Sequence, residues 1–324
     1  MNKPILVLAI AAVGAISLTT GQASAANVKI TALGTHDGEF CRRDRAFLFE
    51  DPNGTTLLFD AGRSVLGSSD PRLGKVDVVL LSSVHGDHLG DRIPPALNAG
   101  TCAKPKTSVR TTPNSNTAEI AAKKKSKVVV GGQMRGFLRA KVKAAGGSAK
   151  QVDILRFGGK RTVGGVKIAI VQTLHANGVS PAFLDKAMVD AMKPDGLTAY
   201  VGPDNGYILT FTNGLVVYLS GDTGHTSDMD TIVRRYYKAE LAIVNIGDIF
   251  TMGPEEAAWA VNELIRPKAV IPTHANEEAT KGGKVKPGSK TAKFMKLVKD
   301  IPVHLPLSGK AMEFDGNAKC VTGC

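Results

Sequence analysis

Short runs of apolar and β-branched residues recur along the chain and alternate with polar, glycine-rich segments. Each run has the length and composition of a buried β-strand. The runs cover residues 28–33, 55–59, 76–81, 127–130, 166–171, 207–211, 215–219, 241–246 and 269–271. Asn213 and Gly214 separate two of these runs and predict a tight β-hairpin, because both residues tolerate positive φ.

Three further stretches have the composition of helices, at residues 115–125, 133–145 and 254–265. The last is the clearest, because Pro254 suits a first helical turn and the two glutamates that follow it favour the positive end of the helix. Pro267 lies just beyond the residue where this helix is expected to end. Strands that alternate with helices and hairpins predict a mixed α/β sandwich.

The first 25 residues have the three parts of a secretory signal peptide. A basic, polar start is followed by an apolar run over residues 5–18 and by the small residues Ala23, Ser24 and Ala25. A membrane anchor is the alternative, but the run is shorter than the roughly 20 residues that a spanning helix needs. We therefore expect a signal peptide at 1–25 and one periplasmic or secreted domain at 26–324, with no membrane span after cleavage.

The chain contains four cysteines, and an even number in an exported protein indicates disulfides. Three pairings are possible. We favour Cys41 with Cys102 and Cys320 with Cys324, because the second pair would close a short terminal loop. Four reduced thiols or a zinc cluster are the alternatives.

The formal charge of +12 is concentrated in residues 104–150, which contain twelve Lys or Arg and one acid, Glu119. Such a region could attract anionic substrates, envelope polymers or nucleic acid. The alternative is a solvated helical surface that keeps the protein soluble. We favour this alternative and expect no specific nucleic-acid partner, because the region lacks aromatic residues interleaved for stacking on bases.

Ionisable side chains follow the ends of four predicted strands. A structural histidine or a helix-capping aspartate would explain any one of them alone, but not all of them together. Imidazole and carboxylate groups suit zinc, and also manganese or iron, so this set predicts a site for one or two divalent ions. Its members are His85, Asp87, His88, His175, Asp222 and His274.

Other polar residues could support the predicted metal site without binding an ion. His225 is close in sequence to Asp222 and could support a ligand, His36 could line the mouth of the site, and His304 is expected to be structural. Asp248 either orients a ligand through hydrogen bonds or caps a loop. Residues 177–205 either cover the substrate or form a peripheral helix with apolar residues turned to the core.

Residues 83–88 read Ser-Val-His-Gly-Asp-His and resemble the His-x-His-x-Asp-His motif of the metallo-β-lactamase superfamily, with Ser83 in place of the first histidine. The chain is most similar to the branch that holds ascorbate-phosphate lactonases and poorly characterised metal-dependent hydrolases. Similar segments occur at 221–224, 245–248, 250–257 and 270–274. The similarity is clear over residues 76–274, plausible over 30–62 and not visible after Glu277.

This resemblance implies an αββα sandwich with the metal site at one edge, between two mixed sheets. It implies one ion bound by His85 and His175, a second bound by three other residues, and Asp222 bridging both. A hydroxyl is a weaker ligand than an imidazole, so Ser83 predicts a less strongly filled first position. We expect two ions when the supply is ample. The three residues that the resemblance assigns to the second ion are Asp87, His88 and His274.

A bound ion lowers the pKa of coordinated water to roughly 7 and so provides hydroxide at neutral pH. Asp222 is expected to position this hydroxide and to carry a proton, with Asp87 as the alternative. The expected substrate is a small molecule, possibly an anion, that contains a lactone; a β-lactam is second and a phosphodiester third. A non-catalytic metal-binding or ligand-binding protein is the alternative of another class, and Ser83 is the feature that suggests it.

Overall fold

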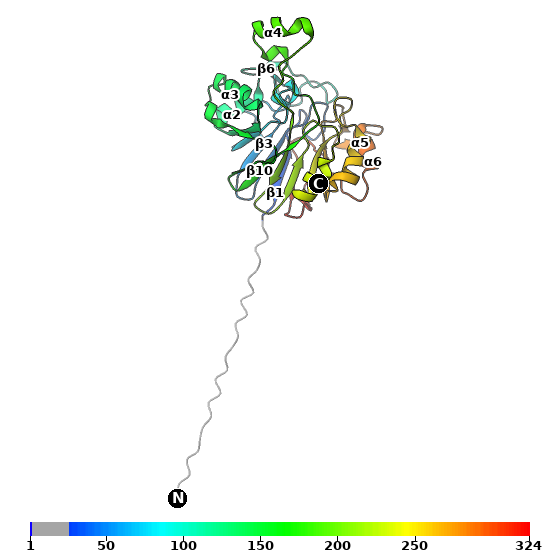
Figure 1. The fold of residues 1–324 in the computed structure, drawn as a ribbon. Coiled ribbons are helices and arrows are strands. Elements are labelled where there is room, and N and C mark those ends of the chain that lie inside the picture. The colour runs from blue at the N-terminus through cyan, green and yellow to red at the C-terminus, as the bar shows by residue number, and fades with distance from the viewer. Residues whose placement is uncertain (2–25) are drawn as a thin grey trace.

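The computed structural model describes Met1 and residues 26–324, so the predicted signal peptide lies outside the described residues. Two large sheets organise residues 26–324 (Figure 1). The first has the order β18 (Cys320–Thr322), β17 (Ala311–Phe314), β1 (Val28–Ala32), β2 (Phe47–Glu50), β3 (Thr56–Phe59), β4 (Val78–Leu80), β7 (Lys127–Gly131) and β8 (Val152–Leu155). The second has the order β14 (Ala269–Thr273), β13 (Leu241–Asn245), β12 (Val216–Leu219), β11 (Asn205–Thr210), β10 (Val166–Gln172) and β9 (Lys160–Val163). Short ribbons pair β5 (Arg92–Ile93) with β6 (Val109–Arg110) and β15 (Thr280–Lys281) with β16 (Lys284–Val285).

Helices cover the outer face of each sheet (Figure 1). The helices α2 (Asn116–Lys124) and α3 (Met134–Ala144) pack on the first sheet. On the second sheet lie α5 (Pro254–Trp259), which continues as the π-helical turns of η5 (Ala260–Ile265), and α6 (Lys290–Leu297). The remaining helical elements are α1 (Gly86–Leu89), α4 (Lys186–Met192), η1 (Ala149–Gln151), η2 (Pro181–Phe183), η3 (Lys193–Asp195) and η4 (Met229–Tyr236).

The alternation of side chains along the strands explains why the layers form. Ile30 in β1 and Leu209 in β11 point between the sheets and are fully buried, whereas Ile208, the neighbour of Leu209, packs in the cluster that contains the helices of the second sheet. Burial of an apolar side chain of this size contributes about 1.5–3 kcal/mol. The predicted αββα sandwich is therefore confirmed.

Each predicted strand and helix forms, with bounds that differ by a few residues. In the hairpin between β11 and β12, Phe211 N donates to Leu215 O at 2.9 Å, so residues 212–214 form the loop. Of its two predicted turn residues only Gly214 has a positive φ, at 95°. The turn is therefore longer than a two-residue hairpin loop.

The C-terminal residues, for which no similarity was visible, form part of the first sheet. β17 pairs antiparallel with β1, and Ile30 lies opposite Met312. Phe314 on the same strand is fully buried. This strand was missed because only four residues alternate between buried and half-buried positions.

Residues 177–205 match neither of the two predicted interpretations. α4 projects from the body of the protein at the top of Figure 1, and Met188 is 41% exposed. Only neighbouring residues such as Phe183 pack against the core, beside Phe137 of α3. The helix is thus peripheral without being turned to the core, and its residues do not line the metal cavity described below.

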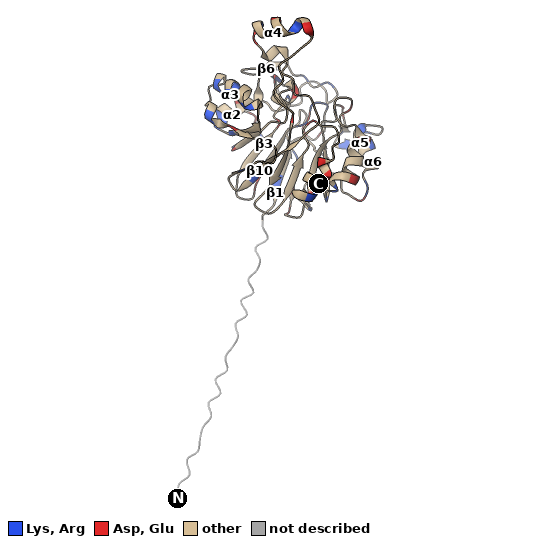
Figure 2. Ribbon diagram, viewed as in Figure 1, with Lys and Arg blue, Asp and Glu red and all other residues tan. Residues whose placement is uncertain are grey.

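Half of the twelve basic residues of 104–150 lie on α2 and α3, where Figure 2 shows them in blue. The side chains of Lys123 and Lys143 are exposed. Among the residues that the structure describes, no helix combines the length and apolar character needed to cross a membrane.

Candidate metal centre

The turn after β4 carries three of the predicted ligands. Ser82 starts the turn, and its backbone N and its Oγ both donate to the carboxylate of Asp60, at 2.8 and 2.6 Å. His85 then begins the short helix α1, which carries Asp87 and His88. Gly62 lies directly against this helix, and a Cβ there would come within 2.4 Å of the Asp87 carbonyl oxygen. The turn is therefore held by two hydrogen bonds and a close backbone contact.

His85, His175 and Asp222 come together as one group of donor atoms, all within 4.8 Å of one another. His175 follows β10, and its Nε2 lies 3.8 Å from Asp222 Oδ2. The rings of His85 and His175 have centroids 5.3 Å apart and are nearly perpendicular. These residues could hold one metal ion and are the first candidate metal position, called the first position below.

Asp87, His88 and His274 form a second group of donor atoms, also within 4.8 Å of one another. His274 Nε2 lies 3.7 Å from Asp87 Oδ2 and 3.4 Å from Asp222 Oδ1. His88 Nε2 lies 3.0 Å from Asp222 Oδ2. Asp222 therefore faces both groups, as the resemblance implied for a bridging ligand.

The donor set fits a divalent ion on its chemistry. Imidazole nitrogens and carboxylate oxygens are the ligands that zinc and similar ions take in proteins. His274 Nε2 and Asp222 Oδ1 are buried and have no hydrogen-bond partner in the described part of the chain. Buried polar atoms are nearly always paired, so two such atoms 3.4 Å apart fit the binding of a cation between them.

Asp60 supports the second position and was missed by the sequence analysis. His88 Nδ1 donates to Asp60 Oδ2 at 2.7 Å, which leaves Nε2 free to bind an ion. Asp60 directly follows the strand β3, so it carries the same strand-end signal that identified the other ligands. It was overlooked because no histidine lies next to it in the sequence.

Charges in the second group shift several pKa values. Burial alone would lower the pKa of His88, but Asp222, Asp60 and Asp87 outweigh burial and raise it well above its usual value. Burial would raise the pKa of Asp222, but His274 and His88 lower it below its usual range. In the first position, burial lowers the pKa of both His85 and His175. Burial thus favours the neutral form of both imidazoles, which is the form that binds a metal ion.

Arg45 is a second residue that the sequence analysis missed. It is buried, donates to Asp87 Oδ2, and its Nη1 lies 3.3 Å from His88 Nε2. Burial would raise the pKa of Asp87, but Arg45 and His88 hold it well below its usual value. Arg45 therefore keeps this carboxylate ionised and oriented.

A cavity of about 620 Å³ opens over the ligands and has a cationic wall. Arg63 is paired with Asp91 through two hydrogen bonds of 2.6 and 3.0 Å. Arg43 is half-buried and forms no salt bridge within the described residues, and burial together with neighbouring arginines lowers its pKa. A volume of this size suits a small molecule. The cations that line the cavity are Arg42, Arg43, Arg45, Arg63 and Lys290.

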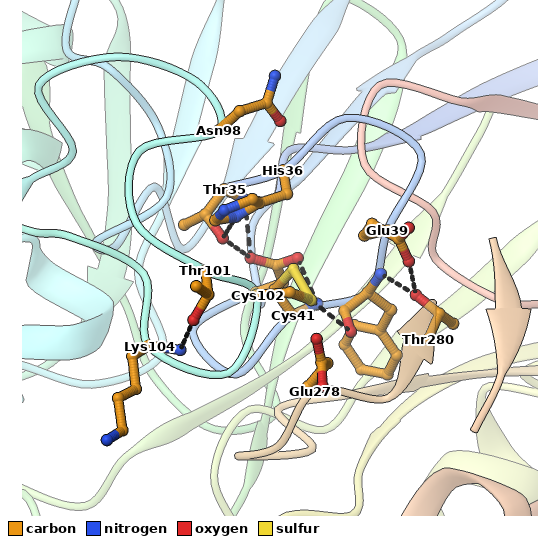
Figure 3. Close-up of a disulfide and its surroundings, with 12 residues drawn as sticks. Thr35, His36, Glu39, Cys41, Asn98, Thr101, Cys102, Lys104, Glu278 and Thr280 are labelled. Carbon is orange, nitrogen blue, oxygen red and sulfur yellow. Dashed lines mark hydrogen bonds between the residues drawn. A yellow bond between two sulfur atoms is a disulfide. The ribbon is translucent and has the colours of Figure 1, made fainter. Parts of the chain in front are cut away.

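The loop that carries Arg42, Arg43 and Arg45 begins at Cys41, which a disulfide joins to Cys102 (Figure 3). The structure also joins Cys320 to Cys324. The buried carboxylate of Asp44 accepts hydrogen bonds from the backbone N of Thr35 and of Cys41, both at 2.8 Å. Burial raises the pKa of Asp44 to about 6. The disulfide and the hydrogen bonds to Asp44 therefore both fix this loop.

Ser83 lies at the first position of the motif and is fully buried. Its Oγ accepts from His85 N at 3.1 Å and lies 3.4 Å from Asn177 Oδ1. Nearby, burial raises the pKa of Asp204 to about 9. The sequence analysis did not single out Asp204, because it follows no ligand motif.

The structure places some of the predicted supporting residues elsewhere. His36 does not line the cavity; its Nδ1 lies 3.1 Å from Thr35 Oγ1, beside the disulfide in Figure 3. His225 is exposed, and its ring packs against Trp259 instead of supporting a ligand. His304 packs against Phe314. Asp248 does line the cavity.

Comparisons with known proteins agree with this geometry. Residues 43–274 match the family model described as the beta-lactamase superfamily domain. A UPF0173 metal-dependent hydrolase of Koribacter versatilis is 31% identical over 227 residues, which cover 69% of this chain and 77% of that protein. A UPF0173 metal-dependent hydrolase of Thermodesulfovibrio yellowstonii is 30% identical over 239 residues, which cover 71% and 74%.

A solved structure shows the same fold. It is a metallo hydrolase from the hyperthermophilic archaeon Ignicoccus hospitalis, with a TM-score of 0.57 and 20% sequence identity. The match covers 89% of this chain and 99% of that one. At this identity the likeness concerns the fold alone.

Proposed function

The chain belongs to the β-lactamase superfamily and is a metal-dependent hydrolase of that superfamily, and from this premise we propose that it is exported and opens a lactone that carries an anionic group. The match extends the resemblance of residues 83–88 to most of the chain. The observation that carries the proposal is the position of two donor groups in one cavity whose wall holds five cationic side chains.

Bound ions would supply hydroxide at neutral pH and would stabilise the negative charge that develops on the substrate. The chain's own residues do the rest. The Asp222 carboxylate faces both donor groups, so it is placed to orient the attacking group and to carry a proton to the leaving oxygen. Arg43 and Arg42 have no acidic partner in the described residues and are placed to bind an anionic group of the substrate.

The cationic wall narrows the class of substrate. An uncharged lactone would leave the half-buried Arg43 without a counter-charge, whereas a carboxylate or phosphate on the substrate would pair with it. A β-lactam that carries a carboxylate and a phosphodiester both meet the same requirement. They are therefore the second and third candidates.

The two disulfides support export. Disulfides persist in oxidising compartments such as the periplasm and are rare in the cytosol. Export through the proposed signal peptide would place the substrate outside the cytoplasm. Recovery of the processed protein from a periplasmic or culture fraction tests this part of the proposal.

A substrate panel tests the reaction. The purified protein is stripped of metal, reloaded with zinc or manganese, and assayed on a carboxylated lactone, its uncharged analogue, a β-lactam and a phosphodiester. We expect metal-dependent opening of the carboxylated lactone, loss of turnover in Asp222→Asn, and unchanged turnover in Asp195→Asn, which alters an exposed aspartate. Metal binding without hydrolysis of any substrate would instead show a binding protein.

A further inference from the structure

The first metal position lacks one ligand because of Ser83. The side chain is fully buried, and its hydroxyl is already engaged with His85 N and Asn177 Oδ1. Serine also fills much less volume than the imidazole that the motif would place there. The residue at this position therefore supplies no imidazole to the first donor group.

Asp204 lies beside Ser83. Asn205, the next residue, donates its backbone N to Ser82 O at 2.9 Å, which holds residue 204 against the turn. The opposite side of this chain segment faces Gly221, where a Cβ would come within 2.7 Å of Asn205 O. Asp204 thus sits between the Ser83 turn and the loop that carries Asp222.

The carboxylate of Asp204 has no partner of its own. The residue is 0% exposed, and neither Oδ1 nor Oδ2 has a hydrogen bond within the described residues. The hydroxyl of Ser83 is the polar side chain that faces it, without the geometry of a hydrogen bond. A buried and unpaired carboxyl group is costly, so its presence beside the Ser83 turn calls for a partner.

We propose that Asp204 replaces the missing histidine and is the third ligand, with His85 and His175, of the ion that Asp222 bridges. The inference rests on the metal-dependent function proposed above. The Asp204 carboxylate lies outside the group of atoms formed by His85, His175 and Asp222, so its side chain turns toward them when an ion binds. Two carboxylates in place of one make the donor set harder, which favours manganese or iron over zinc at this position.

Metal binding by variants tests this proposal directly. Asp204→Asn removes the charged ligand and keeps the shape, whereas Ser83→His with Asp204→Ala restores the motif. Elemental analysis gives the number of ions bound, and the absorption spectrum of bound cobalt reports their ligands. Neither measurement depends on turnover. We expect two ions in the wild type, and in Asp204→Asn at least about 100-fold weaker binding of one of them, because loss of a ligand should exceed the 10–100-fold cost of losing a residue that only supports a ligand.

The restored-motif variant distinguishes loss of a ligand from misfolding. This variant also lacks the Asp204 carboxylate. We expect it to bind an ion at the first position again, with a cobalt spectrum altered by the added imidazole. Asp195→Asn should bind metal as the wild type does. Wild-type affinity for both ions in Asp204→Asn would overturn the proposal, as would a folded restored-motif variant that binds one ion. Two ions in the wild type with no hydrolysis would end the proposed function and leave this inference standing.

Discussion

The two metal positions share Asp222 but differ in how the chain supports them. In the second position, His88 is buried and hydrogen-bonded to Asp60, and Asp87 is backed by Arg45. In the first position His85 and His175 are half-buried, and their ring nitrogens have no hydrogen bond within the described residues. The ligands of the second position are therefore held by hydrogen bonds and an ion pair, whereas the histidines of the first are not. The second should fill first and hold its ion more tightly.

Removal of one histidine from each position should show this difference most strongly. We expect His274→Ala to lose the tightly held ion and its turnover, because the second group then retains only two ligands. His175→Ala should keep one tightly held ion and a measurable fraction of turnover. Elemental analysis after dialysis, with kcat/KM on the same samples, checks both. Equal metal loss in the two variants would show that the positions are equally supported.

Asp60→Asn should weaken the second position without removing a ligand. The amide cannot hold the His88 ring as the carboxylate does, and loss of such an outer partner costs about 10–100-fold in metal affinity. Competition with a chromogenic chelator measures this change. Asp51→Asn is the matched control, because Asp51 is also buried but caps Thr212, which is not a ligand. A similar loss of affinity in both variants would assign the effect to general destabilisation.

The two positions should also differ in their dependence on pH. In the metal-free protein the pKa of His88 is raised well above its usual value, so an ion at the second position must displace a proton. Its affinity should fall about tenfold for each pH unit below that raised pKa. Burial lowers the pKa of His85 and His175, so these imidazoles should release no proton near pH 7. Burial raises the pKa of Asp204 to about 9, so this carboxyl group must lose a proton to bind the first ion.

Proton release can be counted by calorimetry in two buffers of different ionisation enthalpy. His175→Ala isolates the second position and should release one proton per ion, from His88. In His274→Ala, which isolates the first position, the histidines should release none and Asp204 should release one. The protonated His88 also stabilises the metal-free fold at low pH, and this contribution is lost as the pH rises through the raised pKa. Absence of proton release from His175→Ala would contradict the assignment to His88.

The ligands could be predicted from the sequence because each directly follows an apolar strand. Such strands bring their carboxyl ends to one edge of the sandwich, so His85, His175 and His274 converge without further information. The same rule would have found Asp60. Arg45 and Asp204 could not be predicted, because their roles depend on which loops meet in space.

Nearness in sequence proved a poor guide to the supporting residues. His225 lies three residues from Asp222, yet its ring packs against Trp259 at a centroid distance of 5.4 Å. His36 faces Thr35 beside the disulfide instead of the cavity. The direction of a loop side chain depends on its tertiary neighbours, which a linear pattern does not contain. The arginines at 42–45 likewise look like an ordinary charged segment until the disulfide places them at the cavity.

Arg43→Gln should have the smallest effect and should leave both metal positions unchanged. Arg43 lines the cavity without an acidic partner, whereas Arg63 is already neutralised by Asp91. Loss of one charge-assisted hydrogen bond of about 1.5 kcal/mol predicts a KM about tenfold higher for the carboxylated lactone. The uncharged analogue should keep its KM, because it has no group for Arg43 to bind. Arg110→Gln, outside the cavity and exposed, is the control. A rise in KM for both lactones, or a change in metal content, would mean that Arg43 supports the ions, and that the two positions differ less than their hydrogen bonds indicate.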